Sequence, residues 1–147
     1  MDYEKGMLPR HDNIKGLVQD LTEKLDARMD ALIVGTLVEH IRPSDKKTFM
    51  LIARHPRTIS ELARALRITR QAAHKSVLRL IEHGVIELQP APDSKRDKIP
   101  IVTEKGQLIR RIAAQNLDKI EAEIEAKISK RRLEEFRETL IELLNAD

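Results

Sequence analysis

Apolar residues recur every three or four positions in two long stretches, one toward each end of the chain. Such spacing predicts amphipathic helices, each with one apolar stripe. The first stripe, expected to continue to about residue 41 before Pro43 ends the helix, comprises Ile14, Leu17, Val18, Leu21, Leu25, Met29, Leu32 and Ile33. The second, which begins after Thr103, comprises Ile109, Ile112, Ala113, Leu117, Ile120, Ile124 and Ile128. Ser129 then caps a last helix, and its apolar face comprises Leu133, Phe136, Leu140, Leu143 and Leu144.

The middle of the chain is divided into shorter elements by proline, glycine and capping residues. Ser44 can cap a helix that stops before Pro56, because the residue before a proline disfavours helical backbone. Residues 58–61 (Thr-Ile-Ser-Glu) have the spacing of a capping box and open a short helix. Thr69 caps the next helix, which closes at Gly84. The face of this helix that is predicted to be buried comprises Ala73, Val77, Leu80 and Ile81. Two short helices with such a connection predict a helix-turn-helix.

The next segment predicts a β-hairpin. Residues 85–89 alternate as a strand does, residues 90–97 form a polar loop, and residues 98–102 provide the return strand. Pro100 has no backbone N–H, so the return strand fits only at the edge of a sheet. A hairpin that directly follows a helix-turn-helix is called a wing, and this name is used below.

Composition favours the same helical architecture. Only 2% of the 147 residues are aromatic, so the core must be aliphatic, which is typical of helices more than of a sandwich or barrel. We expect a single, mainly α-helical domain over residues 1–147, with a winged helix-turn-helix at 43–102. The helical segments 10–42 and 103–147 carry more apolar surface than a small winged helix can cover. We therefore expect them to form a homodimer; the alternative is that they pack only within one chain.

Charge is distributed unevenly along the chain. The totals, 27 basic and 24 acidic residues, give a net charge of only +3. Residues 57–79, however, hold six cations and one acid, whereas residues 117–147 hold six cations and nine acids. A local basic segment on a near-neutral chain is typical of a protein that binds a polyanion, although a solvated helical face would have the same charge pattern.

Several classes of function are disfavoured by what the sequence lacks. There is no cysteine, and no glycine-rich phosphate loop or catalytic constellation is apparent, so we expect no enzyme activity and no cofactor. The five histidines lack the spacing of metal ligands, so we expect no metal. The polar N-terminus and the lack of a long apolar run predict a cytoplasmic protein.

The motifs of the middle segment occur in a recognisable order. Residues 58–66 (TISELARAL), 68–81 (ITRQAAHKSVLRLI) and 82–86 (EHGVI) are followed by Lys95-Arg96 and by 101–106 (IVTEKG). This series resembles the MarR family of transcription regulators. It is similar to the two helices of the family's helix-turn-helix, the turn into the wing, the wing arginine and a Leu-Thr-x-x-Gly signature.

The resemblance implies a dimer that binds double-stranded DNA, with one recognition helix in each major groove and each wing in a flanking minor groove. It also implies a repressor on a pseudo-palindromic operator, and release by a small-molecule effector, as in many relatives. The only aromatic residues are Tyr3, Phe49 and Phe136, so no effector-binding residues are predicted.

The side chains of the second short helix suit such a role. Gln71 can bond adenine in a bidentate way, and Lys75 can reach the acceptors of guanine. Arg96 on the wing suits a narrow minor groove, where the potential is most negative. The predicted DNA contacts are Thr69, Arg70, Gln71, Ala72, His74, Lys75, Arg79, Lys95, Arg96 and Lys98.

Two departures from the family pattern concern the wing. Ser94 occupies the position where the family usually has an aspartate that orients the wing arginine, and Asp93 lies one residue earlier. Pro100 in the return strand is expected to shorten the hairpin. The alternative function is a winged helix that binds a protein partner, or that binds DNA as an architectural module without reading its sequence.

Overall fold

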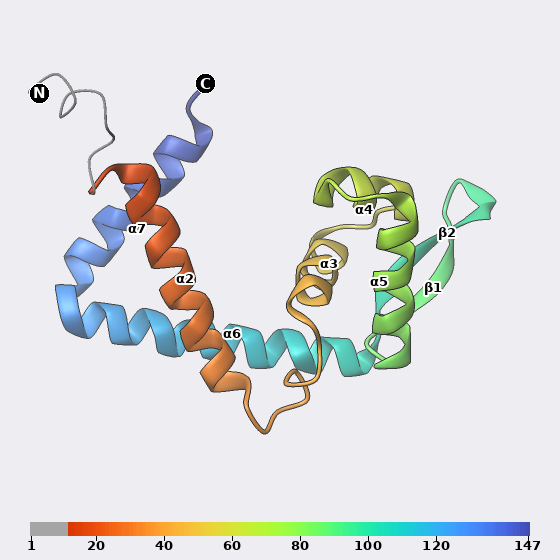
Figure 1. The fold of residues 1–147 in the computed structure, drawn as a ribbon, viewed down its shortest axis with the longest axis horizontal. Coiled ribbons are helices and arrows are strands. Elements are labelled where there is room, and N and C mark those ends of the chain that lie inside the picture. Colours follow the sequence, from red (N-terminus) through yellow and green to blue (C-terminus); the bar gives the residue numbers. More distant parts are fainter. Residues whose placement is uncertain (1–11) are drawn as a thin grey trace, which may run out of the picture. The chain divides into compact units, whose positions relative to one another are not determined.

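The computed structural model describes residues 12–147, apart from the side chain of Lys95 (Figure 1). Its elements are α2 (Ile14–Ile33), α3 (Pro43–Arg54), α4 (Ile59–Leu66), α5 (Arg70–Glu82), β1 (Ile86–Ala91), β2 (Ser94–Val102), α6 (Glu104–Ile128) and α7 (Lys130–Asn145). Residues 1–11, which include the start of the predicted segment 10–42, lie outside the described part. A mainly α-helical winged helix with a two-stranded hairpin is thus confirmed. None of the helices described is long and apolar enough to cross a membrane.

The chain divides into two compact units, and each is described by itself. One, called here the head unit, comprises residues 35–115 and contains α3, α4, α5, the wing and the first part of α6. The described part of the other, called the arm unit, comprises residues 12–34 and 116–147, with α2, the rest of α6 and α7.

The head unit is built around side chains that solvent does not reach. Leu62 of α4, Val77 and Leu80 of α5, and Val85 at the entry to the wing are each 0% exposed. Helix α5 packs against α3, α4 and β1. The helix-turn-helix and the wing therefore share one continuous apolar core.

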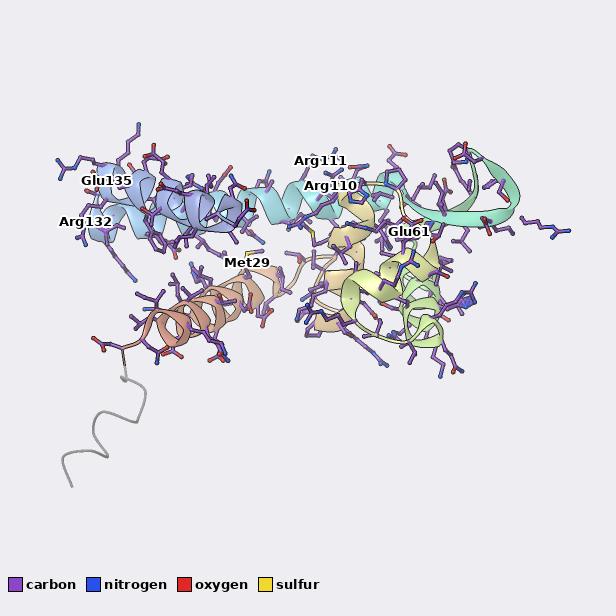
Figure 2. The ribbon with its side chains drawn as sticks, turned by 90° about the horizontal axis from the view of Figure 1, so that it is seen from above. Met29, Glu61, Arg110, Arg111, Arg132 and Glu135 are labelled. Carbon is purple, nitrogen blue, oxygen red and sulfur yellow. The ribbon has the colours of Figure 1, made fainter. Side chains whose placement is uncertain are left out.

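Side-chain caps define the ends of the two short helices. Thr58 Oγ1 accepts a hydrogen bond from the backbone N–H of Glu61 at 3.2 Å, and the Glu61 carboxylate accepts from Thr58 N at 3.3 Å, which confirms the capping box. Figure 2 labels Glu61 in the first turn of α4. Thr69 Oγ1 accepts from Ala72 N at 3.0 Å and caps α5 as predicted. Between the two helices Arg67 adopts a left-handed conformation with φ of 56°. A turn that usually requires glycine is thus made by an arginine.

The wing is longer than the sequence predicted. Its strands are antiparallel, with Leu88 opposite Pro100 and Ala91 opposite Ser94, so the return strand begins at Ser94 rather than at residue 98. Pro100 does not shorten the hairpin, and its side chain is buried. In a two-stranded sheet each strand has one side without ladder hydrogen bonds, which leaves a place for a residue that lacks an N–H.

Helix α6 begins very close to the wing. A Cβ atom on Gly106 would lie 2.4 Å from the carbonyl oxygen of Val85 and 2.6 Å from Cγ1 of Val102, so only glycine fits there without a shift. Thr103 Oγ1 accepts from Gly106 N at 3.1 Å and donates to the Gly84 carbonyl at 2.6 Å. Through Thr103 the start of α6 is therefore hydrogen-bonded to the residues that directly follow α5.

The first long helix ends earlier than predicted. Helix α2 stops at Ile33 instead of continuing to about residue 41, because Gly35 has φ of 79° and the chain turns there. Residues beyond the turn keep a helix-like apolar spacing, and Val38 and Ile41 are buried in the head unit. Helix α3 then begins at Pro43, so Ser44 lies inside the helix and is not its N-cap.

The arm unit has ion pairs between its helices and a large exposed apolar surface. Arg28 of α2 pairs with Glu123 of α6, and Arg137 of α7 pairs with Glu121, each with an N–O distance of 2.6 Å. Its exposed large apolar residues are Ile14, Leu17, Val18, Leu21, Val34, Leu117, Phe136, Ile141, Leu143 and Leu144. The arm unit thus leaves much of its apolar stripe uncovered.

Candidate nucleic-acid interface

Helix α5 has one buried face and one polar face. Ala73, Val77 and Leu80 are 0% exposed, as predicted from their spacing. The opposite side and the N-terminus of the helix present six exposed residues: Thr69, Arg70, Gln71, Ala72, His74 and Lys75. The backbone N–H groups at this end carry a partial positive charge, which favours an anion nearby.

The wing and helix α5 line a shared hollow of about 400 Å³. Its charged and imidazole side chains are Arg70, His74, Arg96, Asp97 and Lys98. Arg70 is turned toward α4, because its Nε–H donates to Ser60 Oγ at 3.2 Å. The structure thus brings predicted contacts from the helix and from the wing to one concave surface with more cations than acids.

Ser94 shapes the tip of the wing. Its Oγ accepts hydrogen bonds from the backbone N–H groups of Arg96 at 3.2 Å and Asp97 at 3.3 Å. An aspartate makes the same kind of local turn with its carboxylate, so serine at this position still orders the backbone that carries Arg96. The Arg96 side chain is exposed. The side chain of Lys95 lies outside the described part of the structure.

Arg79 differs from the other predicted contacts, because its guanidinium is directed back toward α3. Nε lies 2.8 Å from Oδ2 of Asp45, and Nη2 lies 2.9 Å from Oδ1. The Asp45 side chain is 0% exposed and that of Arg79 is 31% exposed. Such a bidentate pair has a fixed geometry. Arg79 is therefore a half-buried partner of Asp45 and is not a free surface cation.

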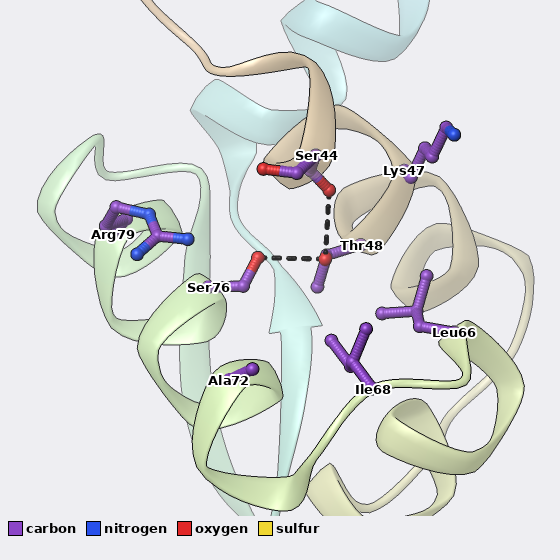
Figure 3. A pocket seen from close by; sticks show the side chains of 8 residues that line it. All are labelled: Ser44, Lys47, Thr48, Leu66, Ile68, Ala72, Ser76 and Arg79. Carbon is purple, nitrogen blue, oxygen red and sulfur yellow. Dashed lines mark hydrogen bonds between the residues drawn. The ribbon is translucent and has the colours of Figure 1, made fainter.

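Two hydroxyl groups complete this buried cluster. Ser76 Oγ donates to Asp45 Oδ1 at 2.6 Å. It also lies 2.8 Å from Thr48 Oγ1, a contact that Figure 3 shows. Burial by itself raises the pKa of Asp45, but the hydrogen bonds from Arg79 and Ser76, together with the positive charges of Arg79 and Arg42, outweigh it, so the pKa lies below its ordinary value. The hydrogen bond to Asp45 raises the pKa of Arg79. The carboxyl group is therefore ionised at neutral pH.

The cluster borders a second hollow, of about 340 Å³, between α3 and the helix-turn-helix. Its lining comprises Ser44, Lys47, Thr48, Leu66, Ile68, Ala72, Ser76 and Arg79 (Figure 3). Asp45, Thr48 and Ser76 were not among the site residues predicted from the sequence. The only signal was their spacing: Asp45 and Thr48 lie three residues apart, as do Ser76 and Arg79, so each pair shares one helix face.

The six cations of the basic segment have different environments. Arg57 donates from Nη1 to the Leu51 carbonyl at 2.6 Å and thus binds the end of α3, and Arg79 is paired with Asp45. Arg64, Arg67, Arg70 and Lys75 are exposed. Of the six cations in this segment, these four are therefore the ones that can meet a polyanion directly.

Within residues 12–147 no group of three or more His, Cys, Asp or Glu side chains could hold a metal ion. His11, one of the five histidines, lies outside the described residues.

Comparison with known proteins agrees with this architecture. The model of the MarR family matches residues 43–97, which run from the start of α3 into the tip of the wing. The winged helix of this chain is therefore similar to that of the MarR family. The match covers both short helices and the wing arginine. No curated protein sequence matches the chain significantly.

Solved structures resemble the fold of this chain over nearly its whole length. A crystal structure of FabT from Streptococcus pneumoniae in complex with DNA has a TM-score of 0.74 and 19% identity, and covers 92% of this chain and 95% of that one. A mutant of MarR from E. coli has a TM-score of 0.73 and 19% identity, with coverage of 92% and 99%. RV1404 from Mycobacterium tuberculosis has a TM-score of 0.72 and 20% identity, with coverage of 95% and 97%. At these identities the likeness establishes the fold, and the flanking helices α2, α6 and α7 belong to it.

Proposed function

We propose that this MarR-fold protein is a transcriptional regulator that binds double-stranded DNA in a sequence-specific manner. The observation that carries the proposal is the exposed polar face of α5, which stands beside a wing whose cations line the same hollow. A helix of this kind fits the major groove, whose base edges it can read. The structure of FabT with DNA supports the proposal by fold.

Base reading is assigned to the middle of the exposed face. Gln71 and Lys75 lie one helical turn apart and are both exposed, so they can reach neighbouring base pairs. A glutamine amide pairs with adenine and a lysine with guanine, and the Ala72 methyl can contact thymine. His74, on the side toward the wing, lines the hollow with Arg96.

Phosphate binding is assigned to the ends of this surface. Thr69 and Arg70 lie at the N-terminus of α5, where free amides and positive charge favour a phosphate. Arg96 and the neighbouring lysines of the wing would enter the minor groove or follow its backbone. We expect Arg96→Ala to weaken binding to all DNA sequences. The slope of the logarithm of the binding constant against the logarithm of the salt concentration should become shallower by about one unit. Binding constants measured over a salt series check this, and an unchanged slope would remove Arg96 from the interface.

A homodimer is part of the proposal, with residues 43–102 as its DNA-binding part and 10–42 and 103–147 as its dimerisation part. Ile14 of α2 is 71% exposed and Leu144 of α7 is 83% exposed, so the arm unit has apolar surface that a second copy would bury. A two-fold dimer binds a pseudo-palindromic operator. We further propose that it acts in the cytoplasm as a repressor, released by a small molecule.

Selection from random-sequence duplex DNA at physiological salt tests the function, with the mass in solution measured on the same sample. We expect a two-fold symmetric site with half-sites about one helical turn apart. Binding without enrichment would favour an architectural role, because phosphate contacts alone carry no sequence preference. If the protein bound no DNA, the proposal would be wrong and a protein-binding winged helix would replace it.

A further inference from the structure

A buried polar cluster joins α3 to α5 inside the apolar core of the head unit. Asp45 and Thr48 lie one turn apart on α3, and Ser76 and Arg79 lie one turn apart on α5. The Asp45 carboxylate accepts three hydrogen bonds from α5: one from Ser76 and two from Arg79, at 2.6, 2.8 and 2.9 Å. The two helices are thus joined by a carboxylate whose position is fixed from two successive turns of α5.

The apolar contacts of α5 do not fix its rotation as closely. Its buried face is formed by Ala73, Val77 and Leu80, and the hydrophobic effect that holds them is not directional. A bidentate arginine–carboxylate pair, in contrast, is satisfied at only one relative orientation. Buried ionic groups of this kind can define a unique arrangement even where they add little stability.

We propose that Asp45 is a positioning residue for the recognition helix: it fixes the rotation of α5 so that Gln71 and Lys75 face the bases. This inference rests on the proposed function, because it assigns a role in DNA reading to a residue that does not touch DNA. Gln71 and Lys75 share one helix face, so a small rotation of α5 displaces both from their bases together. Asp45 engages Nε and Nη2 of Arg79, which leaves Nη1 for a phosphate of the DNA backbone.

The charge of the cluster allows a positional role to be distinguished from simple destabilisation, because specific and non-specific DNA binding should respond differently to its removal. Asp45→Asn keeps the shape of the side chain but removes one negative charge, so the head unit becomes more cationic. Non-specific binding depends on phosphate contacts and charge, and is expected to stay equal or to become tighter. Specific binding depends on the placement of Gln71 and Lys75, and is expected to weaken.

The experiment compares dissociation constants for the selected operator and for a scrambled duplex of equal length, at one salt concentration and well below the melting temperature. Asp45→Asn is expected to lower the ratio of specific to non-specific affinity about tenfold, the scale of one good base contact. Ile52→Val is the matched control: Ile52 lies on the same helix and is buried, but is not part of the cluster. This control lowers stability and is expected to keep the ratio.

Ser76→Ala tests the same cluster if Asp45→Asn does not fold. It removes one of the three hydrogen bonds to the carboxylate and is expected to lower the ratio by about threefold. An unchanged ratio in a folded Asp45→Asn or Ser76→Ala protein would overturn the inference and leave the proposed function intact. An equal loss in Ile52→Val would also overturn it, because stability and not position would then set the ratio. If the wild-type protein showed no preferred DNA sequence, the proposed function would be wrong, and this inference would be wrong with it.

Discussion

The head unit and the arm unit differ in how completely they bury their apolar side chains. In the head unit Leu62, Val77 and Leu80 have no exposed surface, whereas in the arm unit Ile14 and Leu144 are 71% and 83% exposed. The cross-helix ion pair of Arg28 with Glu123 lies at the surface, and such pairs contribute little to stability. The head unit therefore has a complete core of its own, whereas we expect the arm unit to be completed by another chain.

The largest expected effect concerns the core of the head unit. Leu80→Ala removes a fully buried side chain of α5 and should lower the free energy of unfolding by about 2–5 kcal/mol. Leu78→Ala, on the same helix but 45% exposed, should cost no more than about 1 kcal/mol. Urea denaturation at one fixed protein concentration measures both. Equal costs for the two variants would show that α5 has no distinct buried face.

The next effect concerns the arm unit. A glutamate at Ile141, which is 51% exposed on α7, would place a charge in the apolar surface that the second copy is expected to cover. We expect Ile141→Glu to raise the dimer dissociation constant at least about tenfold. Met50→Glu makes the same change at a 42% exposed position of the head unit and should leave the dimer intact. Sedimentation equilibrium distinguishes them, and a dimer unaffected by Ile141→Glu would place the interface elsewhere.

A smaller effect appears in the pH dependence of stability, which separates the buried pair of the head unit from the exposed pair of the arm unit. The pKa of Asp45 is lower in the folded chain than in the unfolded one, so the folded state binds fewer protons. The resulting stabilisation is present above about pH 4 and is lost as pH falls through the folded-state pKa of Asp45.

Asp45→Asn should therefore reduce the loss of stability between about pH 5 and pH 2. Pairing with Arg28 also lowers the pKa of Glu123, but solvent screens that exposed pair. Glu123→Gln should therefore have a smaller effect on the acid-induced loss of stability than Asp45→Asn. Urea unfolding over this pH range provides the measurement. A steeper acid dependence in Asp45→Asn than in the wild type would contradict the ionised, hydrogen-bonded state of this carboxylate.

Local sequence rules predicted the parts of the fold that local interactions determine. The capping box of Thr58 and Glu61 and the cap at Thr69 depend on residues three positions apart, and both formed as expected. The buried and exposed faces of α5 followed from its 3.6-residue period. Family resemblance supplied the Thr103-x-x-Gly106 signature, and the close approach of Gly106 to the wing explains it.

The features that were missed depend on contacts between distant residues or on one backbone angle. Val38 and Ile41 continue the helical spacing of α2 beyond its true end at Ile33. Only the left-handed turn at Gly35 separates these two residues from the helix. Asp45 and Arg79 are far apart in the sequence, and no local pattern links a carboxylate on one helix to an arginine on another. The candidate site was therefore predictable in its exposed residues but not in the cluster beneath them.

The most direct test of the central claim, that the exposed face of α5 reads bases, is a second selection from random duplex DNA with Gln71→Ala. We expect the preference to be lost at two symmetry-related base pairs, one in each half-site, at a cost of about 1–3 kcal/mol each, while the other positions are unchanged. Recovery of the wild-type site with its preference intact at every position would contradict the assignment of α5 as the reading helix.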